Sequence, residues 1–279
     1  MRCWKWLSAT ASMVVAAAAG SGSAQAAEVK VAVAANFAGP MARIAESFSA
    51  ATGHTVLLSS GATGKFYAQI RSGAPFEVLL AADDETPKRL VSEGHAVAGT
   101  GFTYATGRLV LWSTRAGLVD DQGAVLQGGG FAHLAVANPK TAPYGAAAMQ
   151  VLQARGLVEA LTPKLVMAES IAQAYQFVAT GNAELGFVAL SQVAVPGKPA
   201  PGSRWLVPQA LHEPILQDAV LLQPGTDNPA AKALLEHLKS APVKELIRSY
   251  GYGSRRAGPL AGKALPQQPW TPPIGKPCG

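Results

Sequence analysis

The stretch SSGATGKFYAQIRSGAP, residues 59–75, places a glycine-rich loop directly before a predicted helix. The phosphate loop of nucleotide hydrolases needs four residues between its first glycine and its Gly-Lys pair. Here only two residues separate Gly61 from Gly64. Phe66 follows Lys65, at the position where that loop carries the Ser or Thr that holds magnesium. The stretch is therefore not a nucleotide-binding loop.

The same loop suits an anion for a more general reason. The first N–H groups of a helix lack partners, and the helix dipole makes that end electropositive. Small residues such as Gly61 and Gly64 let an anion approach those N–H groups, and Thr63 adds a hydroxyl. Alternatively, Thr63 caps the helix and the glycines form a tight turn. The stretch alone leaves both interpretations open.

On both sides of this loop, short apolar strands alternate with amphipathic helices. In the first of these helices, Phe37, Met41, Ile44 and Phe48 recur at helical spacing. Such alternation predicts an α/β fold with largely parallel sheets. The expected strands are 29–34, 54–58, 77–81, 107–113, 133–139, 184–190 and 218–223. The expected helices are 37–51, 65–72, 86–94, 143–155, 171–180 and 230–239.

The N-terminus has the pattern of a secretory signal peptide. Arg2 and Lys5 precede an apolar run over 7–19, and small residues at 24–26 predict cleavage after Ala26. The run is short for a transmembrane helix, and a retained membrane anchor is the alternative. Removing Arg2 and Lys5 lowers the formal net charge from +6 to +4. No basic cluster has interleaved aromatic residues, so nucleic acid is not an expected partner.

Cysteine use is typical of the bacterial periplasm. Cys3 leaves with the signal peptide 1–26, so Cys278 stands alone and no internal disulfide can form. An exported protein without disulfides fits the periplasm better than a disulfide-stabilised extracellular domain, and we expect a monomer. Residues 254–279 are rich in proline and lack periodicity, which predicts a disordered or loosely packed tail.

Four helix starts are candidates for one ligand site. Each lies at a junction between a strand or loop and the following helix: Asn36, Thr63, Tyr144 and Ile171. In open α/β sheets, ligands collect at the carboxyl ends of strands, where helix N-termini point. Four converging starts would surround an anion with N–H donors, although spacing alone does not show that they converge.

Six stretches carry a family resemblance. They are AVAANF, SSGATGKFYAQIRSGAPFEVLLAADD, FTYATGRLVLWS, NPKTAPYG, GFVAL and the YGY near residue 250. In this order they resemble the periplasmic molybdate-binding proteins of bacterial ABC importers, from about Val29 to Gly253. The resemblance implies a type II periplasmic binding protein, with two α/β lobes and the ligand in the cleft between them. Lobe 1 would comprise 27–107 and 217–253, and lobe 2 would comprise 108–216, with crossovers near 105–109 and 211–217.

The resemblance also implies a function and a ligand set. The protein would capture molybdate or tungstate and deliver it to a membrane permease, without catalysis and without a cofactor. Molybdenum, bound as molybdate, would be held by Asn36 through its amide and N–H, and by Thr63 through its hydroxyl and N–H. Tyr144 and Ile171 would contribute N–H groups. Ala35 belongs to the same set, but some relatives carry a hydroxyl residue there.

Other assignments remain as alternatives. Ala189 stands where some relatives carry a ligating Tyr, so one donor is missing or supplied elsewhere. Lys65 is expected to face solvent rather than the anion. Sulfate or another tetrahedral oxyanion is the alternative ligand, and an exported hydrolase is the alternative of a different class. The mature chain has no G-x-S-x-G or H-E-x-x-H motif, and Asp83 and Asp84 are expected to cap the following turn.

Overall fold

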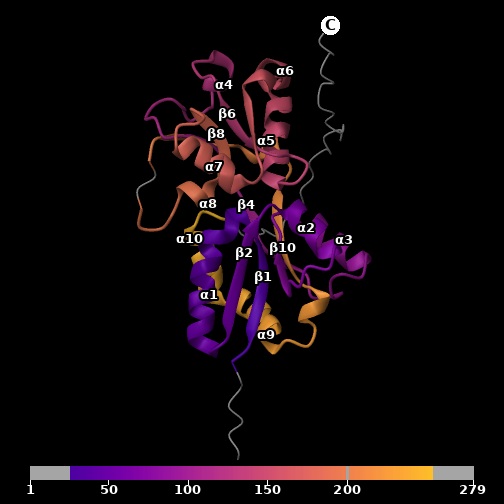
Figure 1. The fold of residues 1–279 in the computed structure, drawn as a ribbon. Helices are drawn as coiled ribbons and strands as arrows, with labels where there is room; N and C mark the ends of the chain where they lie inside the picture. The colour runs from indigo at the N-terminus through magenta and orange to yellow at the C-terminus, as the bar shows by residue number, and fades with distance from the viewer. Residues whose placement is uncertain (1–25, 199–200, 254–279) are drawn as a thin grey trace, which may run out of the picture.

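The computed structural model describes residues 26–198 and 201–253, which form two five-stranded sheets flanked by helices (Figure 1). The predicted signal peptide, apart from Ala26, lies outside the described residues, as do the tail 254–279 and Cys278. In the described part of the chain, every helix is too short or too polar to cross a membrane.

The first sheet has the strand order β2-β1-β3-β10-β4. β1 pairs in parallel with β2 and β3, whereas β10 runs antiparallel to β3 and β4. Its strands are β1 (Glu28–Ala34), β2 (Thr55–Gly61), β3 (Val78–Leu80), β4 (Phe102–Gly107) and β10 (Ile215–Leu221). The helical segments of this lobe are η1 (Ala35–Phe37), α1 (Ala38–Thr52), α2 (Thr63–Arg71), α3 (Glu85–Ser92), η4 (Gln223–Gly225), α9 (Pro229–Leu238) and α10 (Ala241–Ser249).

Side-chain alternation along these strands gives the first sheet two buried faces. Val29, Val31 and Val33 of β1 pack in one cluster with residues of α1, α9 and α10. Ala32 packs on the opposite face with Phe66 of α2 and residues of α3. Because side chains alternate with a period of two along a strand, both faces of β1 meet helices, and its last four residues are all buried.

The second sheet has the order β7-β6-β8-β5-β9. β6 pairs in parallel with β7 and β8, whereas β5 is antiparallel to β8 and β9. Its strands are β5 (Leu109–Ser113), β6 (Leu134–Ala137), β7 (Leu165–Ala168), β8 (Leu185–Ala189) and β9 (Ser203–Leu206). Its helical segments are α4 (Val125–Gly128), α5 (Pro143–Ala154), α6 (Val158–Leu161), η2 (Thr162–Lys164), α7 (Ile171–Ala179), α8 (Leu190–Val193) and η3 (Gln209–Leu211).

The helix signals in the sequence appear as expected in the structure. Ser170 caps α7, since its hydroxyl accepts from the N–H of Gln173 at 3.3 Å. The side chain of Asn228 caps α9 at Ala230 N–H. Gly53 ends α1 with φ +74°, a conformation that costs glycine little. These local features set where the helices begin and end.

Two expectations about the sheets are corrected. The single strand expected over 107–113 is two strands in different sheets: β4 ends at Gly107 and β5 begins at Leu109. The sheets are also mixed rather than largely parallel, because β5 and β10 each run against their neighbours. The physical reason is connectivity: a chain that crosses between lobes enters each sheet from the opposite end. The strands β7 and β9 and the helix α10 were not expected from sequence.

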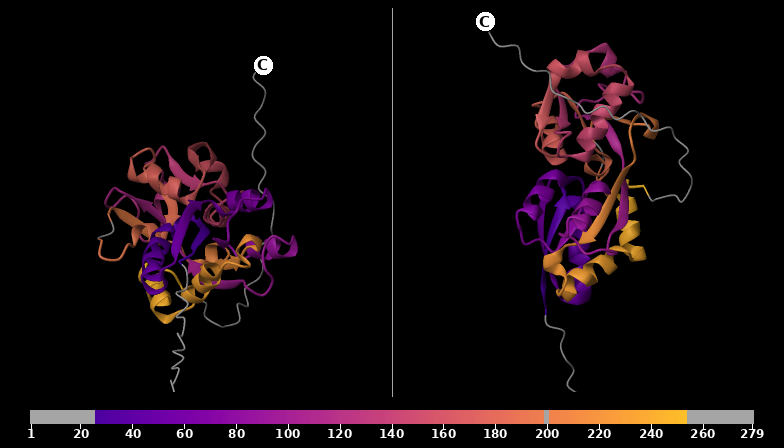
Figure 2. Two further views of the ribbon diagram at one scale, coloured as in Figure 1. Left: turned by 60° about the horizontal axis from the view of Figure 1, so that its bottom comes forward. Right: turned by 90° about the vertical axis from the view of Figure 1, so that its right-hand side faces the viewer.

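The chain crosses between the sheets twice in the described part. It leaves the first sheet at Arg108, between β4 and β5, and returns between β9 and β10. β4 and β10 pair with each other, so the two crossover segments run side by side, as the right-hand view in Figure 2 shows. The exact lobe limits stay a prediction. This arrangement places the carboxyl ends of β1, β2 and β6 toward the space between the lobes.

Candidate functional site

The four predicted helix starts meet at one small cavity between the lobes. Ala35 and Asn36 come from η1 and Thr63 from α2, while Tyr144 comes from α5 and Ile171 from α7. The first three belong to the first lobe and the other two to the second. The complete lining is Ala34, Ala35, Asn36, Gly61, Ala62, Thr63, Ala82, Ala142, Pro143, Tyr144 and Ile171.

The size of the cavity limits what it can hold. Only about 10 Å³ is open to the centre of a water-sized sphere. On this measure, roughly 10–15 Å³ accommodates one water molecule. The polar side chains that line it are almost completely buried, with Asn36 2% and Thr63 1% exposed. The space in this structure is about that of one water molecule, so it is far too small for an amino acid or a sugar.

The backbone supplies N–H donors at this cavity. Thr63 and Ile171 are the first residues of their helices, and Tyr144 is the second residue of α5. N–H groups at these positions have no acceptor within their own helix. The positive ends of the helix dipoles of α2, α5 and α7 therefore face the same space. That arrangement favours an anion.

A hydrogen bond from the backbone positions the hydroxyl of Thr63. Its Oγ accepts a hydrogen bond from the N–H of Ala82 at 3.0 Å, which leaves the hydroxyl hydrogen available. The residue before the helix is Ala62, which has no capping side chain. The alternative that Thr63 merely caps α2 therefore does not describe this structure.

A buried network of polar side chains lies behind Asn36. Its Nδ2 donates to Gln217 Oε1 and to the Tyr252 hydroxyl, both at 2.9 Å. Gln217 Nε2 in turn donates to the hydroxyl of Tyr144, at 3.0 Å. The Ser191 hydroxyl donates to the backbone oxygen of Asn36 at 2.9 Å. This network joins both lobes, and it occupies the amide N–H groups that were expected to face the ligand.

No carboxylate or ammonium group lines the cavity. The one titratable lining residue is Tyr144, and burial raises the pKa of its hydroxyl well above the ordinary value of 10.0. Tyr144 therefore stays neutral at physiological pH. The positive potential of the cavity comes from N–H groups and helix dipoles alone.

Two contacts bridge the lobes at the rim of the cavity. The N–H of Gly64 donates to the backbone oxygen of Thr141 at 2.9 Å. Next to it, Lys65 of α2 forms an ion pair with Glu169, which lies just before α7. Both charged side chains are at least half exposed. Lys65 is therefore outside the cavity lining and faces solvent, as expected.

The acidic pair after β3 has a structural role. Asp83 accepts from both the N–H and the hydroxyl of Thr86, at 2.8 and 3.1 Å, so it caps the turn as expected. Burial raises the pKa of Asp83 from 3.8 to about 6. Asp84 instead pairs with Lys88 one turn along α3. Neither carboxylate lines the cavity.

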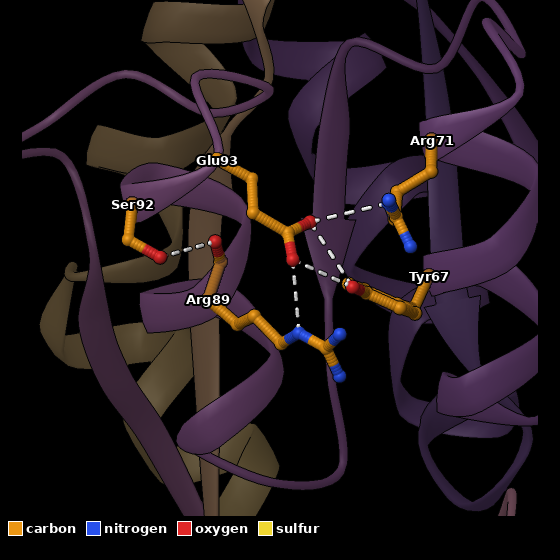
Figure 3. Close-up of polar contacts among 5 residues, drawn as sticks. All are labelled: Tyr67, Arg71, Arg89, Ser92 and Glu93. Atoms are coloured by element: carbon orange, nitrogen blue, oxygen red, sulfur yellow. Dashed lines mark hydrogen bonds and ion pairs between the residues drawn. The ribbon is translucent and has the colours of Figure 1, made fainter.

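A surface cluster fixes α2 against α3 (Figure 3). The Glu93 carboxylate accepts from the Tyr67 hydroxyl at 2.8 Å and from Arg89 Nε at 3.0 Å, and it pairs with Arg71 at 3.4 Å. The Arg89 guanidinium lies 4.5 Å from the centre of the Tyr67 ring. The Tyr67 hydrogen bond is the main reason that the pKa of Glu93 is lowered. Through this cluster, α3 helps to hold the helix that presents Thr63.

Similarity to known proteins identifies the family. The model of the bacterial extracellular solute-binding protein family matches residues 29–253. The chain belongs to this family. Its fold is the two-lobed type II fold of periplasmic binding proteins. A solved structure of the Azotobacter vinelandii periplasmic molybdate-binding protein superposes with a TM-score of 0.80, at 43% identity, covering 82% of this chain and all of that one.

Curated relatives of this solute-binding protein carry the same description. The molybdate-binding protein ModA of Azotobacter vinelandii is 64% identical over 222 residues, covering 80% of this chain and 88% of the relative. The ModA of Rhodobacter capsulatus is 56% identical over 221 residues, covering 79% and 86%. These relatives are binding proteins, so this chain is a binding protein and not an enzyme.

Two alanines that the sequence singled out supply no side-chain donor, and two polar residues near the site were not singled out. Ala189 is fully buried but does not line the cavity, and Ala35 lines it without a side-chain donor. Gln217 and Tyr104, which complete the network behind Asn36, were not predicted. The one signal for Gln217 is that it and Asp218 are two polar residues in the middle of the strand ILQDAVL, whose other residues are apolar.

Proposed function

We propose that this solute-binding protein captures molybdate, or the equally charged tungstate, in the periplasm and delivers it to the membrane permease of an ABC transporter. The observation that carries the proposal is a single small cavity where helix starts of both lobes present N–H groups and no charged side chain. The molybdate-binding proteins that are 64% and 56% identical to this chain over the aligned residues support the same ligand.

The oxyanion is held by donors alone in this proposal. The backbone N–H groups of Asn36, Thr63, Tyr144 and Ile171 and the Thr63 hydroxyl point to its oxygens, and Ala35 leaves room for it. Molybdate is a dianion without a proton near neutral pH, so every one of its oxygens accepts. Hydrogen bonds to a charged group contribute about 1.5–3 kcal/mol each. A handful of such bonds in a dry cavity suffices for tight binding.

The same donor set discriminates against phosphate. Near neutral pH phosphate carries at least one proton, and burying an O–H without an acceptor costs about 1–3 kcal/mol. The carboxylates of Asp83 and Asp84, which follow the lining residue Ala82, are bonded to Thr86 and Lys88 and lie outside the lining. Sulfate, the alternative ligand, meets the donor requirement but is smaller than molybdate. Its rejection depends on whether the fixed helix starts reach its oxygens.

Delivery follows from the position of the cavity between the lobes. An ion contacted by both lobes stabilises their closed arrangement, and a permease can sense occupancy through that arrangement. The protein then acts as a monomer in the periplasm, exported by the predicted signal peptide 1–26.

Isothermal titration calorimetry at neutral pH tests the proposed function. We expect molybdate and tungstate to bind strongly, sulfate weakly and phosphate not at all. Native mass spectrometry of the purified protein should then show one oxyanion for each chain. Tight phosphate binding, or a failure of molybdate to bind, contradicts the proposal.

A further inference from the structure

Gln217 lies outside the cavity lining, yet it contacts two residues that line it. It sits on β10 and is completely buried. Its Oε1 accepts from Asn36 Nδ2 at 2.9 Å, and its Nε2 donates to the Tyr144 hydroxyl at 3.0 Å. Asn36 belongs to the first lobe and Tyr144 to the second. Gln217 therefore connects the ligand-lining residues of both lobes from behind.

In this arrangement the atom of the Asn36 amide that has no partner is an oxygen, which cannot donate to an oxyanion. Nδ2 is occupied by Gln217 and Tyr252. Oδ1 is buried and has no hydrogen-bond partner within the described residues. One atom of the Asn36 amide bonds within the network, and the other, at the position that Oδ1 now occupies, is left for a ligand. An oxygen there would repel an oxyanion, and an N–H would bind it.

We propose that Gln217 is a positioning residue that decides whether Asn36 offers the ligand an oxygen or an N–H. The proposal rests on the proposed function, because it concerns the same oxyanion. A half-turn of a carboxamide exchanges its nitrogen and oxygen without changing its shape. If Asn36 alone turned, its Oδ1 would face Gln217 Oε1 at the 2.9 Å that now separates donor from acceptor. Two acceptors at that distance repel each other.

A joint half-turn of both amides removes this conflict. Gln217 Nε2 then donates to Asn36 Oδ1, and the Tyr144 hydroxyl donates to Gln217 Oε1. At present the Tyr104 hydroxyl lies 2.9 Å from both Gln217 Oε1 and Ala81 O, and its one hydrogen can serve only one of them. After the joint half-turn, this hydroxyl accepts from Gln217 Nε2 and donates to the backbone oxygen of Ala81. Asn36 Nδ2 is released for the ligand.

The two arrangements are closely matched within the protein. The first leaves the Tyr104 hydroxyl between two acceptors. The second leaves the Tyr252 hydroxyl between two acceptors, because Asn36 Oδ1 and the backbone oxygen of Asn36 then both lie within reach of its single hydrogen. The ligand decides between them: an oxyanion favours the arrangement with Nδ2 released. Asn36 reaches that arrangement only because Gln217 can reverse its own donor and acceptor.

Two variants of Gln217 separate positioning from mere support of the fold. A carboxylate only accepts, so Gln217→Glu satisfies Asn36 Nδ2 and both tyrosine hydroxyls but blocks the joint half-turn. Gln217→Met has a similar length and leaves Asn36 free to turn alone. In calorimetry with molybdate we expect Gln217→Glu to weaken binding by more than a hundredfold and Gln217→Met by less than tenfold. Thermal unfolding confirms that both variants fold.

Neutron diffraction from deuterated crystals decides the orientation directly, without the added charge of Gln217→Glu. In crystals with molybdate, we expect the deuterons of Gln217 to point to Asn36 and those of Asn36 to point away from Gln217. Asn36 deuterons that point to Gln217 in the complex overturn the proposal, and so do equal losses of affinity in both variants. Wild-type protein that binds molybdate in the same titration shows that such a result concerns Gln217 and not the proposed function.

Discussion

The N–H of Gly64, in the first turn of α2, donates to the backbone oxygen of Thr141, in the loop before α5, at 2.9 Å. This bond joins two lobes that two crossover segments connect within the described residues. A Cβ atom on Gly64 would lie 2.9 Å from Thr141 Cα and 3.1 Å from its oxygen. The lobes therefore approach this closely at the rim only because residue 64 has no side chain.

Gly64→Ala is expected to weaken molybdate binding by more than tenfold, although it removes no ligand donor. The methyl group meets backbone atoms that cannot turn aside, so the closed arrangement is obstructed. The free energy of unfolding should not fall, since Ala is favoured over Gly within a helix by about 0.5–1 kcal/mol. Calorimetry measures the affinity, and small-angle scattering should show a radius of gyration that no longer decreases with molybdate.

Gly128→Ala is the matched control for this variant, since a Cβ there meets no atom within 4 Å. It should bind molybdate and close as the wild type does. If Gly64→Ala also closes normally, the contact with Thr141 does not limit closure.

The ion pair between Lys65 and Glu169 should contribute little to affinity. Both side chains are at least half exposed, and exposed pairs typically contribute about 0.2–1 kcal/mol. We expect Lys65→Gln and Glu169→Gln each to weaken molybdate binding by less than about fivefold, with the difference shrinking at high salt. If Lys65 instead held the anion, Lys65→Gln alone would cause a large loss, and Glu169→Gln would tighten binding by freeing the ammonium.

Asn36→Asp should weaken molybdate binding by more than about tenfold, since ~1.4 kcal/mol corresponds to one decade. The substitution keeps the shape but replaces an amide that can donate with a carboxylate that repels the anion. Asn36→Asp that binds molybdate normally in calorimetry would place the site elsewhere.

Thr63→Val should lower both affinity and stability, because it leaves the buried N–H of Ala82 without the acceptor it has now. An unsatisfied buried donor costs about 1–3 kcal/mol. Thr63→Ser keeps the hydroxyl and should preserve both properties. Urea unfolding and calorimetry on the two variants check this, and equal behaviour of Val and Ser would mean that the hydroxyl is unimportant.

Asp83 should make the protein less stable as the pH rises. Its folded pKa, raised by burial to about 6, lies above the ordinary value of 3.8, so the folded state holds this proton more tightly. The contribution of this proton to the free energy of unfolding is therefore fully present below about pH 4 and is lost as the pH rises through about 6. The loss is at most about 3 kcal/mol, and smaller to the extent that water still reaches this partly buried carboxyl.

Asp83→Asn should remove that dependence while keeping an oxygen that accepts from Thr86 N–H. In urea unfolding at several pH values, the variant should gain stability relative to the wild type between about pH 4 and 6.5. A constant difference across this range would show that burial of Asp83 carries no such cost.

Sequence patterns predict the helix starts of this protein well, because their signals are local. Ser170 caps α7 through a bond to a residue three positions away, and Pro143 opens α5 because its ring fixes a φ that suits the first helical turn. One cavity is lined by all four residues that the family resemblance implies as ligands: Asn36, Thr63, Tyr144 and Ile171. Their contact with an ion is still a prediction. Spacing alone did not indicate this convergence, which came from the family resemblance.

Other features depend on contacts between residues far apart in the chain. Gln217 forms a hydrogen bond with Asn36, which is 181 positions away in the sequence, and no local sequence pattern predicts such a pair. The direction of β10 follows from the return crossover rather than from its own apolar sequence. The strand SRWL (β9) is too short and too polar to show a period of two, and it forms because Trp205 packs into the core of the second lobe.

The two crossovers also set an order of assembly. All five strands of the second sheet come from one continuous segment, 109–206. In the first sheet, the strand between β3 and β4 is β10, which comes from residues 215–221, after that segment. During synthesis from the N-terminus, the second lobe thus has all its strands before the first lobe does. β3 and β4 stay apart until β10 arrives between them, and a chain interrupted before Ile215 would expose two unpaired strand edges. The cavity needs both lobes, so it cannot be complete before the first lobe has received β10.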